Sequence, residues 1–404
     1  MSAVEKEITR AETQRRSGWE ERKAKYLWQQ ITTPSSSSRK IGLENLESFM
    51  GRFIESEAQF EGNGVAFEQG DILYGKLRPY LAKVWVAEFA GNAVGDFFVY
   101  RLNGGIDAHY MQYYMLSSQF TANANASTYG ARMPRVSAEY MANCPIPFPP
   151  LPEQKAIVAY LDAETGRIDK AIAEEEKMIA LLQERREIVI NEAVGGGEDF
   201  NAEAQRRRGW EWRRLKTLAT CNDEVLPEST SDFARIEYIE ISDVDESRGI
   251  FNSTFHVFKD APSRARRITR EGDVIISTVR TYLKAIATIE REGLVVSTGF
   301  AVLRARSCIL PRFLAYAVKS AEFKDKVVRH STGTSYPAIN TSDLMCLSVP
   351  LPPLHEQEEI VKRLDCETGK IDRAIEVKRR QIELLRERRQ IVIDEAVTGK
   401  VKVV

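Results

Sequence analysis

Basic and aromatic side chains gather in two stretches of the sequence, one in each half. The second-half group is Arg264, Arg266, Arg267, Arg270, Arg280 and Lys284, with Tyr282 and Tyr336; the first-half group is Lys76, Arg78, Lys83, Arg132 and Arg135, with Tyr80 and Tyr129. Guanidinium groups beside aromatic rings suit contact with phosphates and bidentate reading of guanine in a major groove. Because a run of charges is equally typical of an ordinary solvated face, these residues alone do not separate DNA binding from a plain surface.

The sequence lacks the motifs of the common catalytic sites. We find no GxxxxGK[ST] loop, no GxGxxG after a strand, no GxSxG, no HExxH and no NPPY or DPPF tetrapeptide of an amino-methyltransferase. The four histidines are scattered, and the five cysteines form no CxxC pair, so we expect neither a metal site nor a disulfide framework. The chain is therefore predicted to perform no bond chemistry and to bind no cofactor itself.

The composition is that of a globular protein without a membrane-spanning segment. Hydrophobic residues make up 43% of the 404 residues and charged residues 28%, which argues against disorder. Residues 1–12 carry alternating charges, and nowhere do about 18 apolar residues run together, so we expect a cytoplasmic protein with no membrane partner. The net charge of −1 gives no global sign of nucleic-acid binding, so any such role must come from local clustering.

The segments that follow these basic stretches contain a block of residues that occurs twice in the chain. The block PFPPLPEQ at 147–154 returns as PLPPLHEQ at 350–357, and the match continues without a gap to EAV at 192–194 and 395–397. Gln154 corresponds to Gln357, an offset of 203 residues. A period this long is far above that of solenoid repeats, so each half is predicted to be a domain followed by a helix.

Each repeated block predicts one long helix, because its seam residues are spaced alternately by four and three, as in a coiled coil. The seam residues that we expect to form the helix pair or to meet partners are Leu161, Ile168, Ile172, Glu175, Ile179, Leu182 and Val189 in the first copy, and Leu364, Ile371, Ile375, Lys378, Ile382, Leu385 and Val392 in the second. At 1.5 Å per residue, a helix of about 40 residues is on the order of 60 Å long. We expect the two helices to pair antiparallel about an internal pseudo-twofold axis.

Two further features of the helices bear on this pairing. In an antiparallel pair, Glu175 and Lys378 lie near the middle, and we predict that their opposite charges help to fix the register. Gly166 and Gly369 each cost about 1 kcal/mol inside a helix, which suggests the close approach of another chain or backbone. The alternative is two ordinary amphipathic helices that each cover their own domain.

The segments before the helices have short β-rich runs and match each other more loosely. GDILY at 70–74 corresponds to GDVII at 272–276, and residues 97–101 correspond to 300–304. The predicted organisation is a first domain at 1–150, a helix at 151–195, a flexible Gly-rich linker at 196–208, a second domain at 209–352 and a helix at 353–399. The fold class is α+β, with two β-rich domains alternating with the two paired helices. Nearly identical helices imply similar partners, whereas dissimilar domains imply different ones.

The proline-rich blocks, together with LDxETG[RK]ID and EAVxG after each of them, resemble the specificity subunit of type I restriction-modification enzymes, and the resemblance covers essentially the whole chain. It implies a non-catalytic subunit whose target-recognition domains each read one part of an asymmetric, split double-stranded DNA site, with the helices as spacer. It also implies two docked methyltransferase subunits that bring S-adenosylmethionine, and restriction or translocase subunits that can join them. The residues to which it carries DNA contact are Lys76, Arg78, Tyr80, Arg132 and Arg135 in the first domain, and Arg266, Arg267, Arg280, Tyr282, Ser335 and Tyr336 in the second.

Two other interpretations stay open from the sequence. One is a specificity subunit that serves a methylation-only or fused-nuclease system. The other is a coiled-coil scaffold whose β-rich domains bind protein and not DNA, which the near-neutral charge permits. The bases read and the length of the gap between them do not follow from the sequence, because recognition depends on side-chain geometry in loops.

Overall fold

The computed structural model describes residues 19–36, 39–130, 132–195, 210–246, 248–333, 336–401 and 403. The chain divides into two compact units, Met1–Glu175 with Arg380–Val404, and Glu176–Arg379. Each unit therefore contains one β-rich domain and part of each long helix. The predicted linker at 196–208 lies outside the described residues, and the predicted domain boundaries stay predictions.

The first unit holds two four-stranded sheets. One has the order β2 (Trp28–Ile31), β9 (Phe97–Leu102), β6 (Ile72–Gly75), β7 (Val84–Val86); the other has the order β3 (Pro34–Ser35), β5 (Gly64–Phe67), β8 (Gly91–Ala93), β4 (Lys40–Ile41). Successive side chains of a strand point to opposite faces. Accordingly Ile72 and Tyr74 of β6 pack into the core shared with the long helices, whereas Leu73 packs into the core between the sheets. Both faces of β6 are covered, which explains its continuous apolar sequence.

The second unit repeats this plan with additions. Its sheets have the orders β12 (Ala219–Cys221), β21 (Phe300–Ala305), β18 (Val274–Ser277), β19 (Ile286–Thr288) and β16 (Thr254–Val257), β13 (Arg235–Ile239), β20 (Leu294–Ser297), β17 (Ala265–Ile268). A small hairpin of β14 (Val244–Asp245) and β15 (Gly249–Ile250) precedes β16. The first of these sheets repeats the strand order of the first unit, and β17, β20 and β13 correspond to β5, β8 and β4. The fourth strand differs, because β3 lies beside β5 whereas β16 lies beside β13.

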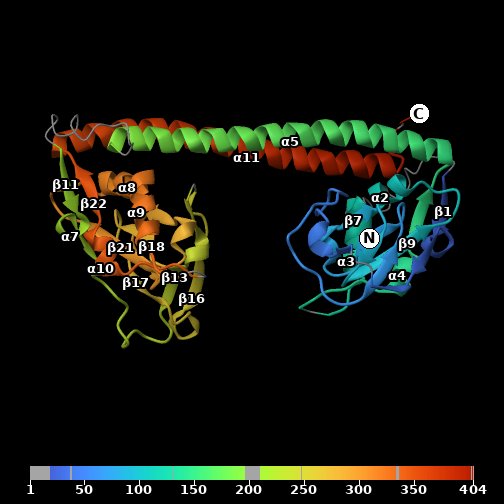
Figure 1. Cartoon of the computed structure of the whole chain (residues 1–404), viewed down its shortest axis with the longest axis horizontal. Helices are drawn as coiled ribbons and strands as arrows, with labels where there is room; N and C mark the ends of the chain where they lie inside the picture. Colours follow the sequence, from blue (N-terminus) through green and yellow to red (C-terminus); the bar gives the residue numbers. More distant parts are fainter. Residues whose placement is uncertain are drawn as a thin grey trace, which may run out of the picture. The chain divides into compact units, whose positions relative to one another are not determined.

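Short helices contribute to the core that each β-rich domain shares with the long helices. The short helices are α2 (Ala108–Leu116), α3 (Ser118–Ala126) and α4 (Ala138–Asn143) in the first unit, and α7 (Leu215–Leu218), α8 (Pro311–Lys319), α9 (Ala321–Arg329) and α10 (Thr341–Cys346) in the second. Of these, α2 and α8 lie next to the long helices (Figure 1). Single 3-10 turns are η1 (Ala24–Tyr26), η2 (Leu43–Asn45), η3 (Pro79–Leu81), η4 (Ile241–Asp243), η5 (Phe258–Asp260) and η6 (Thr281–Leu283). Two-stranded ribbons, β1 (Glu20–Lys23) with β10 (Pro145–Phe148) and β11 (Glu211–Arg214) with β22 (Ser348–Leu351), lead into the long helices.

The long helices are α5 (Leu151–Val194) and α11 (Leu354–Val397), each of 44 residues. They run antiparallel in each unit. In the first unit Leu161 shares a core with Ala396, and Asp169 pairs with Arg389; in the second unit the start of α11 packs against the end of α5. The predicted α+β fold with repeated β-rich domains and paired long helices is confirmed. The alternative, in which each helix covers only its own domain, is wrong, because each β-rich domain packs against both helices.

The predicted seam is largely buried, as helix pairing requires. The buried seam residues are Leu161, Ile168, Ile172, Val189, Leu364, Ile375 and Ile382, and the half-buried ones are Ile179, Leu182, Ile371, Leu385 and Val392. Glu175 and Lys378 lie where the two units divide, so their predicted pairing stays a prediction. A Cβ built on Gly166 would meet no described atom within 4 Å, and one on Gly369 would meet only the Arg373 guanidinium, at 3.6 Å. No described backbone of this chain thus approaches either glycine closely enough to require it.

Candidate nucleic-acid interface

Two loops bring the basic side chains of the first domain together. The loop around η3 and the loop at 128–136 are joined by hydrogen bonds from Arg78 N to Pro134 O (2.8 Å) and from Val136 N to Lys76 O (3.1 Å). The second loop closes on itself, since Tyr129 and Arg135 exchange backbone hydrogen bonds of 3.1 and 3.0 Å. Lys76, Arg78 and Tyr80 therefore lie on one loop of a hydrogen-bonded pair, and Arg132 and Arg135 lie on the other.

The second domain builds the same pair of loops from η6 and residues 331–339. Ile339 N donates to Thr278 O (2.9 Å), and Thr332 and Ala338 exchange backbone hydrogen bonds of 2.8 and 2.9 Å. Gly130 and Gly333 occupy matched places with φ of +90° and +102°. A Cβ on either glycine would lie 3.2 Å from a carbonyl oxygen of its own loop, so both the conformation and the space require glycine.

Both 3-10 turns are bracketed by non-glycine residues in the left-handed region. Arg78 has φ 51° and ψ 61°, and Arg280 has φ 52° and ψ 48°. Ala82 and Lys284 close the same turns at φ 43° and 48°. Such a conformation costs an L-residue on the order of 1–2 kcal/mol. The surrounding hydrogen bonds of the paired loops hold it in place in both domains.

Several of the predicted DNA contacts point into solvent. Arg78, Arg132 and Arg280 are exposed, as are Tyr80, Tyr282 and Tyr336, of which Tyr336 is 66% exposed. The Arg280 guanidinium carbon lies 5.3 Å from the centre of the Tyr336 ring, so the two loops of the second domain meet through a cation–π contact. Ser335 lies outside the described residues.

The other predicted basic residues are engaged within their own domain. Arg135 donates to both oxygens of Asp96 (3.1 and 2.9 Å), and Lys76 Nζ lies 3.9 Å from the same carboxylate. Arg267 donates to the Phe300 carbonyl oxygen and to Asn222, and burial lowers the pKa of its guanidinium. The Arg266 guanidinium carbon lies 4.9 Å from the centre of the Phe258 ring.

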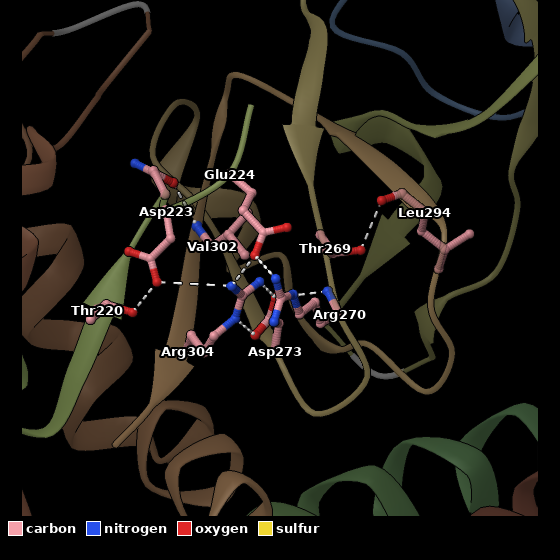
Figure 2. Close-up of polar contacts among 10 residues, drawn as sticks. Thr220, Asp223, Glu224, Thr269, Arg270, Asp273, Leu294, Val302 and Arg304 are labelled. Carbon is pink, nitrogen blue, oxygen red and sulfur yellow. Dashed lines mark hydrogen bonds and ion pairs between the residues drawn. The ribbon is translucent and has the colours of Figure 1, made fainter. Parts of the chain in front are cut away.

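A buried carboxylate braces the strand before each loop pair. In the second domain, Asp273 accepts hydrogen bonds of 2.9 and 2.8 Å from Arg304, which also contacts Glu224 (Figure 2). In the first domain, Asp71 and Arg101 form the same bidentate pair, with two bonds of 2.9 Å. This role was not predicted from the sequence, although the repeated Gly-Asp pair and the matched arginines Arg101 and Arg304 were a signal for it.

The repeated blocks fasten each domain to its helix through matched side chains. Gln154 is fully buried; its oxygen accepts from Asp107 N (2.7 Å), and its amide donates to Pro149 O (2.8 Å) and Gly105 O (3.2 Å). Gln357 makes the same three bonds in the second unit. Tyr113 and Tyr316 each donate to an aspartate of their helix, Asp162 or Asp365, at 2.7 Å. Much of the repeated motif thus holds each β-rich domain at a fixed place relative to its helix.

Each domain is also held by the helix from the other half of the chain. The side chain of Asp394 on α11 accepts from Ser118 N at the start of α3 (2.7 Å), and Asn191 on α5 accepts from Ala321 N at the start of α9 (2.8 Å). A carboxylate or amide oxygen at this place satisfies a backbone donor that the first turn of a helix leaves free. Both helices therefore position the loops of each domain.

Comparison with known proteins shows the family to which this arrangement belongs. A family model described as the type I restriction modification DNA specificity domain matches residues 26–178 and again residues 208–386. The chain belongs to this family. The predicted resemblance is confirmed, and the two matches to the family model coincide with the two halves of the internal repeat.

Members of the type I DNA specificity family from bacteria and archaea are similar to this chain. The EcoDI specificity subunit of Escherichia coli is 36% identical over 114 residues, 26% of this chain and 25% of that protein. The EcoBI specificity subunit of the same species is 26% identical over 264 residues, 60% of this chain and 55% of that protein. The MjaVIII specificity subunit of Methanocaldococcus jannaschii is 22% identical over 293 residues, 69% and 67% of the two chains. The chain thus spans a quarter to just over half of the first two relatives.

A solved structure shares the fold of this family member over nearly its full length. A chain from a structure on the complex assembly and conformational transition of the type I R-M system aligns with a TM-score of 0.67 at 22% identity, covering 96% of this chain and 100% of that one. In the described part of the chain, no helix is long and apolar enough to cross a membrane. Nor do the described residues bring together three or more His, Cys, Asp or Glu side chains able to hold a metal ion.

Proposed function

We propose that this chain is the cytoplasmic, non-catalytic subunit that directs a type I restriction-modification complex to an asymmetric, bipartite site on double-stranded DNA. The observation that carries the proposal is the hydrogen-bonded pair of loops found once in each domain, which presents an exposed arginine and exposed tyrosines. Such loops can contact phosphates and base edges in a groove. Because the side chains of the two pairs differ, the two domains read different bases and the site is asymmetric.

Within this proposal the predicted DNA-contact residues have two kinds of role. Those that contact DNA directly are Arg78, Tyr80 and Arg132 in the first domain and Arg266, Arg280, Tyr282, Ser335 and Tyr336 in the second. Arg135 and Arg267 hold the loops and strands in place through Asp96 and the Phe300 carbonyl. Lys76 contributes positive charge beside the first loop pair.

The long helices carry the docking surface for two methyltransferase subunits, which bring S-adenosylmethionine; restriction subunits join the complex where cleavage occurs. Matched apolar residues stay exposed on the two helices, namely Leu181 and Leu384, each 49% exposed, and Ile188 and Ile391, 39% and 54% exposed. Exposed apolar side chains at repeated positions are typical of a surface that a partner covers. Since the positions match, each unit offers the same surface to one copy of the partner.

The proposal is tested by co-expressing the chain with the methyltransferase encoded beside it and mapping modified bases across the genome by single-molecule sequencing. We expect a split, asymmetric motif that depends on this chain. Arg280→Ala should weaken modification at that motif, and Lys216→Ala, which removes an exposed charge from α7, should not. A stable complex that modifies no motif would refute DNA targeting and favour the protein scaffold.

Docking is tested separately by co-purification. Leu384→Glu combined with Ile391→Glu should reduce the amount of methyltransferase recovered with the chain. Phe233→Glu changes a residue of the second domain that is 85% exposed, and it should leave recovery unchanged. Equal recovery with all three forms would show that the partner binds elsewhere.

A further inference from the structure

Arg78 and Arg280 differ from those arginines around the candidate interface that are held by groups of their own domain. Arg135 pairs with Asp96, Arg304 with Asp273 and Arg270 with Glu224, and Arg267 donates to the Phe300 carbonyl oxygen. Among the described residues, no carboxylate lies within ion-pair distance of either Arg78 or Arg280. The chain has about as many acidic residues (58) as basic ones (57), so most basic side chains could find an acidic partner. Two matched, exposed guanidinium groups without such a partner are available to bind an anion from outside the chain.

The backbone at these two arginines is strained in the same way. Glycine would adopt a φ near +50° without steric cost, yet both domains keep an arginine there. Strain that recurs at matched exposed positions is expected where the side chain itself is needed. Around the turns the two domains share the arginine, the tyrosine two residues later, the leucine after that tyrosine and the shape of the loop, while the residues between and beside them differ.

The neighbouring loop differs between the two domains at one pair of matched, exposed positions. Met133 and Tyr336 stand at matched places, two residues before Arg135 and Ala338, and are 50% and 66% exposed. Each is followed by a proline whose carbonyl oxygen accepts a hydrogen bond from the turn that carries the arginine, at 2.8 Å for Pro134 and 3.3 Å for Pro337. The backbone thus sets residue 133 or 336 beside the arginine turn, while the side chain varies.

We propose that Arg78 and Arg280 each hold a DNA phosphate, whereas Met133 and Tyr336 contact bases and set the sequence that their domain accepts. Phosphates are the same at every site, so their contacts can be shared by two domains that read different sequences. Base edges differ, so the residues that read them must differ as well. In the second domain the cation–π contact of 5.3 Å between Arg280 and Tyr336 ties the phosphate contact to the base contact. This assignment rests on the proposed function.

The experiment measures binding of the purified complex with its methyltransferase to duplexes carrying the mapped motif and to scrambled duplexes, over a series of salt concentrations. Arg78→Ala and Arg280→Ala should each lower the slope of log K against log [salt] by about 1, on both duplexes alike. Arg78→Lys and Arg280→Lys should retain the slope. A change of the bound motif, or an unchanged slope, in the alanine variants would overturn the phosphate assignment.

The base contacts are tested by exchanging the matched residues. Tyr336→Met should weaken binding to the motif by about 5- to 150-fold, with little effect on scrambled DNA, and should alter only one half of the methylated motif. Met133→Tyr should alter only the other half. Equal losses on both duplexes, or an unaltered motif, would overturn this part. If the unmodified complex binds neither duplex, the proposed function fails before the assignment is reached.

A glycine variant separates DNA contact from folding. Arg280→Gly relieves the strained conformation, so the midpoint of thermal unfolding should be unchanged or higher, while the salt slope falls as in Arg280→Ala. If Arg280→Gly bound DNA with the salt slope of the unmodified complex, Arg280 would make no phosphate contact and the inference would be wrong.

Discussion

The matched salt bridges between the long helices give a test in which the chain supplies its own control. In the first unit, Arg389 Nε lies 2.8 Å from Asp169, and the side chains are only 7% and 8% exposed. Arg389 also donates to Phe49 O at 2.9 Å. In the second unit, Arg186 lies 2.9 Å from Asp372 at the corresponding place, but the Asp372 side chain is 47% exposed. The same chemistry therefore occurs in two different dielectric surroundings.

Removing the arginine should have unequal consequences in the two units. Breaking a buried ion pair costs about 3–5 kcal/mol, because the remaining charge has neither a partner nor water. Arg52 also contacts Asp169 and compensates in part, so we expect Arg389→Ala to cost about 3 kcal/mol, the lower end of that range. Water solvates Asp372 readily, so Arg186→Ala should cost at most about 1 kcal/mol.

Urea unfolding of each variant measures the change in the free energy of unfolding. Hydrogen exchange, followed by mass spectrometry, shows in which unit the structure is destabilised. Protection should fall in peptides from β6 and α2 for Arg389→Ala and barely change in peptides from β18 for Arg186→Ala. The double variant Asp169→Leu with Arg389→Met should recover most of the stability, because no charge is left buried. Equal costs for the two single variants would refute the argument from burial.

Three other outcomes follow from the structure. Gln154→Leu should lower the free energy of unfolding by about 1–3 kcal/mol, because it leaves a buried N–H and two carbonyl groups unpaired; urea unfolding measures it, and Gln154→Glu should recover only part. Gly166→Ala with Gly369→Ala should raise the stability of the free chain by about 0.5–1 kcal/mol per site but weaken methyltransferase docking, and unweakened docking would contradict a close approach there. Burial, together with nearby Arg186, lowers the pKa of the half-buried Lys319 to about 8. The unfolded chain therefore binds more protons than the folded one between about pH 8 and 10.5, and stability rises with pH there. Lys319→Leu should stabilise the chain at pH 7, with a gain that shrinks above pH 8; a gain independent of pH would contradict the shift.

Much of the architecture could be predicted from the sequence because it rests on periodicity and repetition. The spacing of Leu161, Ile168 and Ile172 repeats over many turns, and a pattern of that length has few structural solutions. The repeat at an offset of 203 residues predicted that the contacts between domain and helix in the first half occur again in the second. Both predictions depend on many residues at once, so no single substitution obscures them.

The candidate site could be predicted only as two groups of basic residues. Sequence placed Arg78, Arg135, Arg267 and Arg280 in one class, whereas the structure separates the exposed arginines from those held by Asp96 or by the Phe300 carbonyl. Which arginine finds a carboxylate depends on pairings between strands and loops far apart in the chain. A one-dimensional pattern contains no record of such distances.

The family, the two-part organisation and the two long helices could therefore be predicted from the sequence, because hydrophobic spacing and repeated motifs can be read directly from the order of the residues. The three-dimensional structure was needed to show that each domain is fastened to both helices, that Gln154 and Asp162 serve as anchors, and that Arg78 and Arg280 are exposed in strained turns. The anchors form where the cost of burying a polar group is offset by particular hydrogen-bond partners. These partners are far apart in the sequence and come together only in the folded chain, so the sequence alone does not identify them.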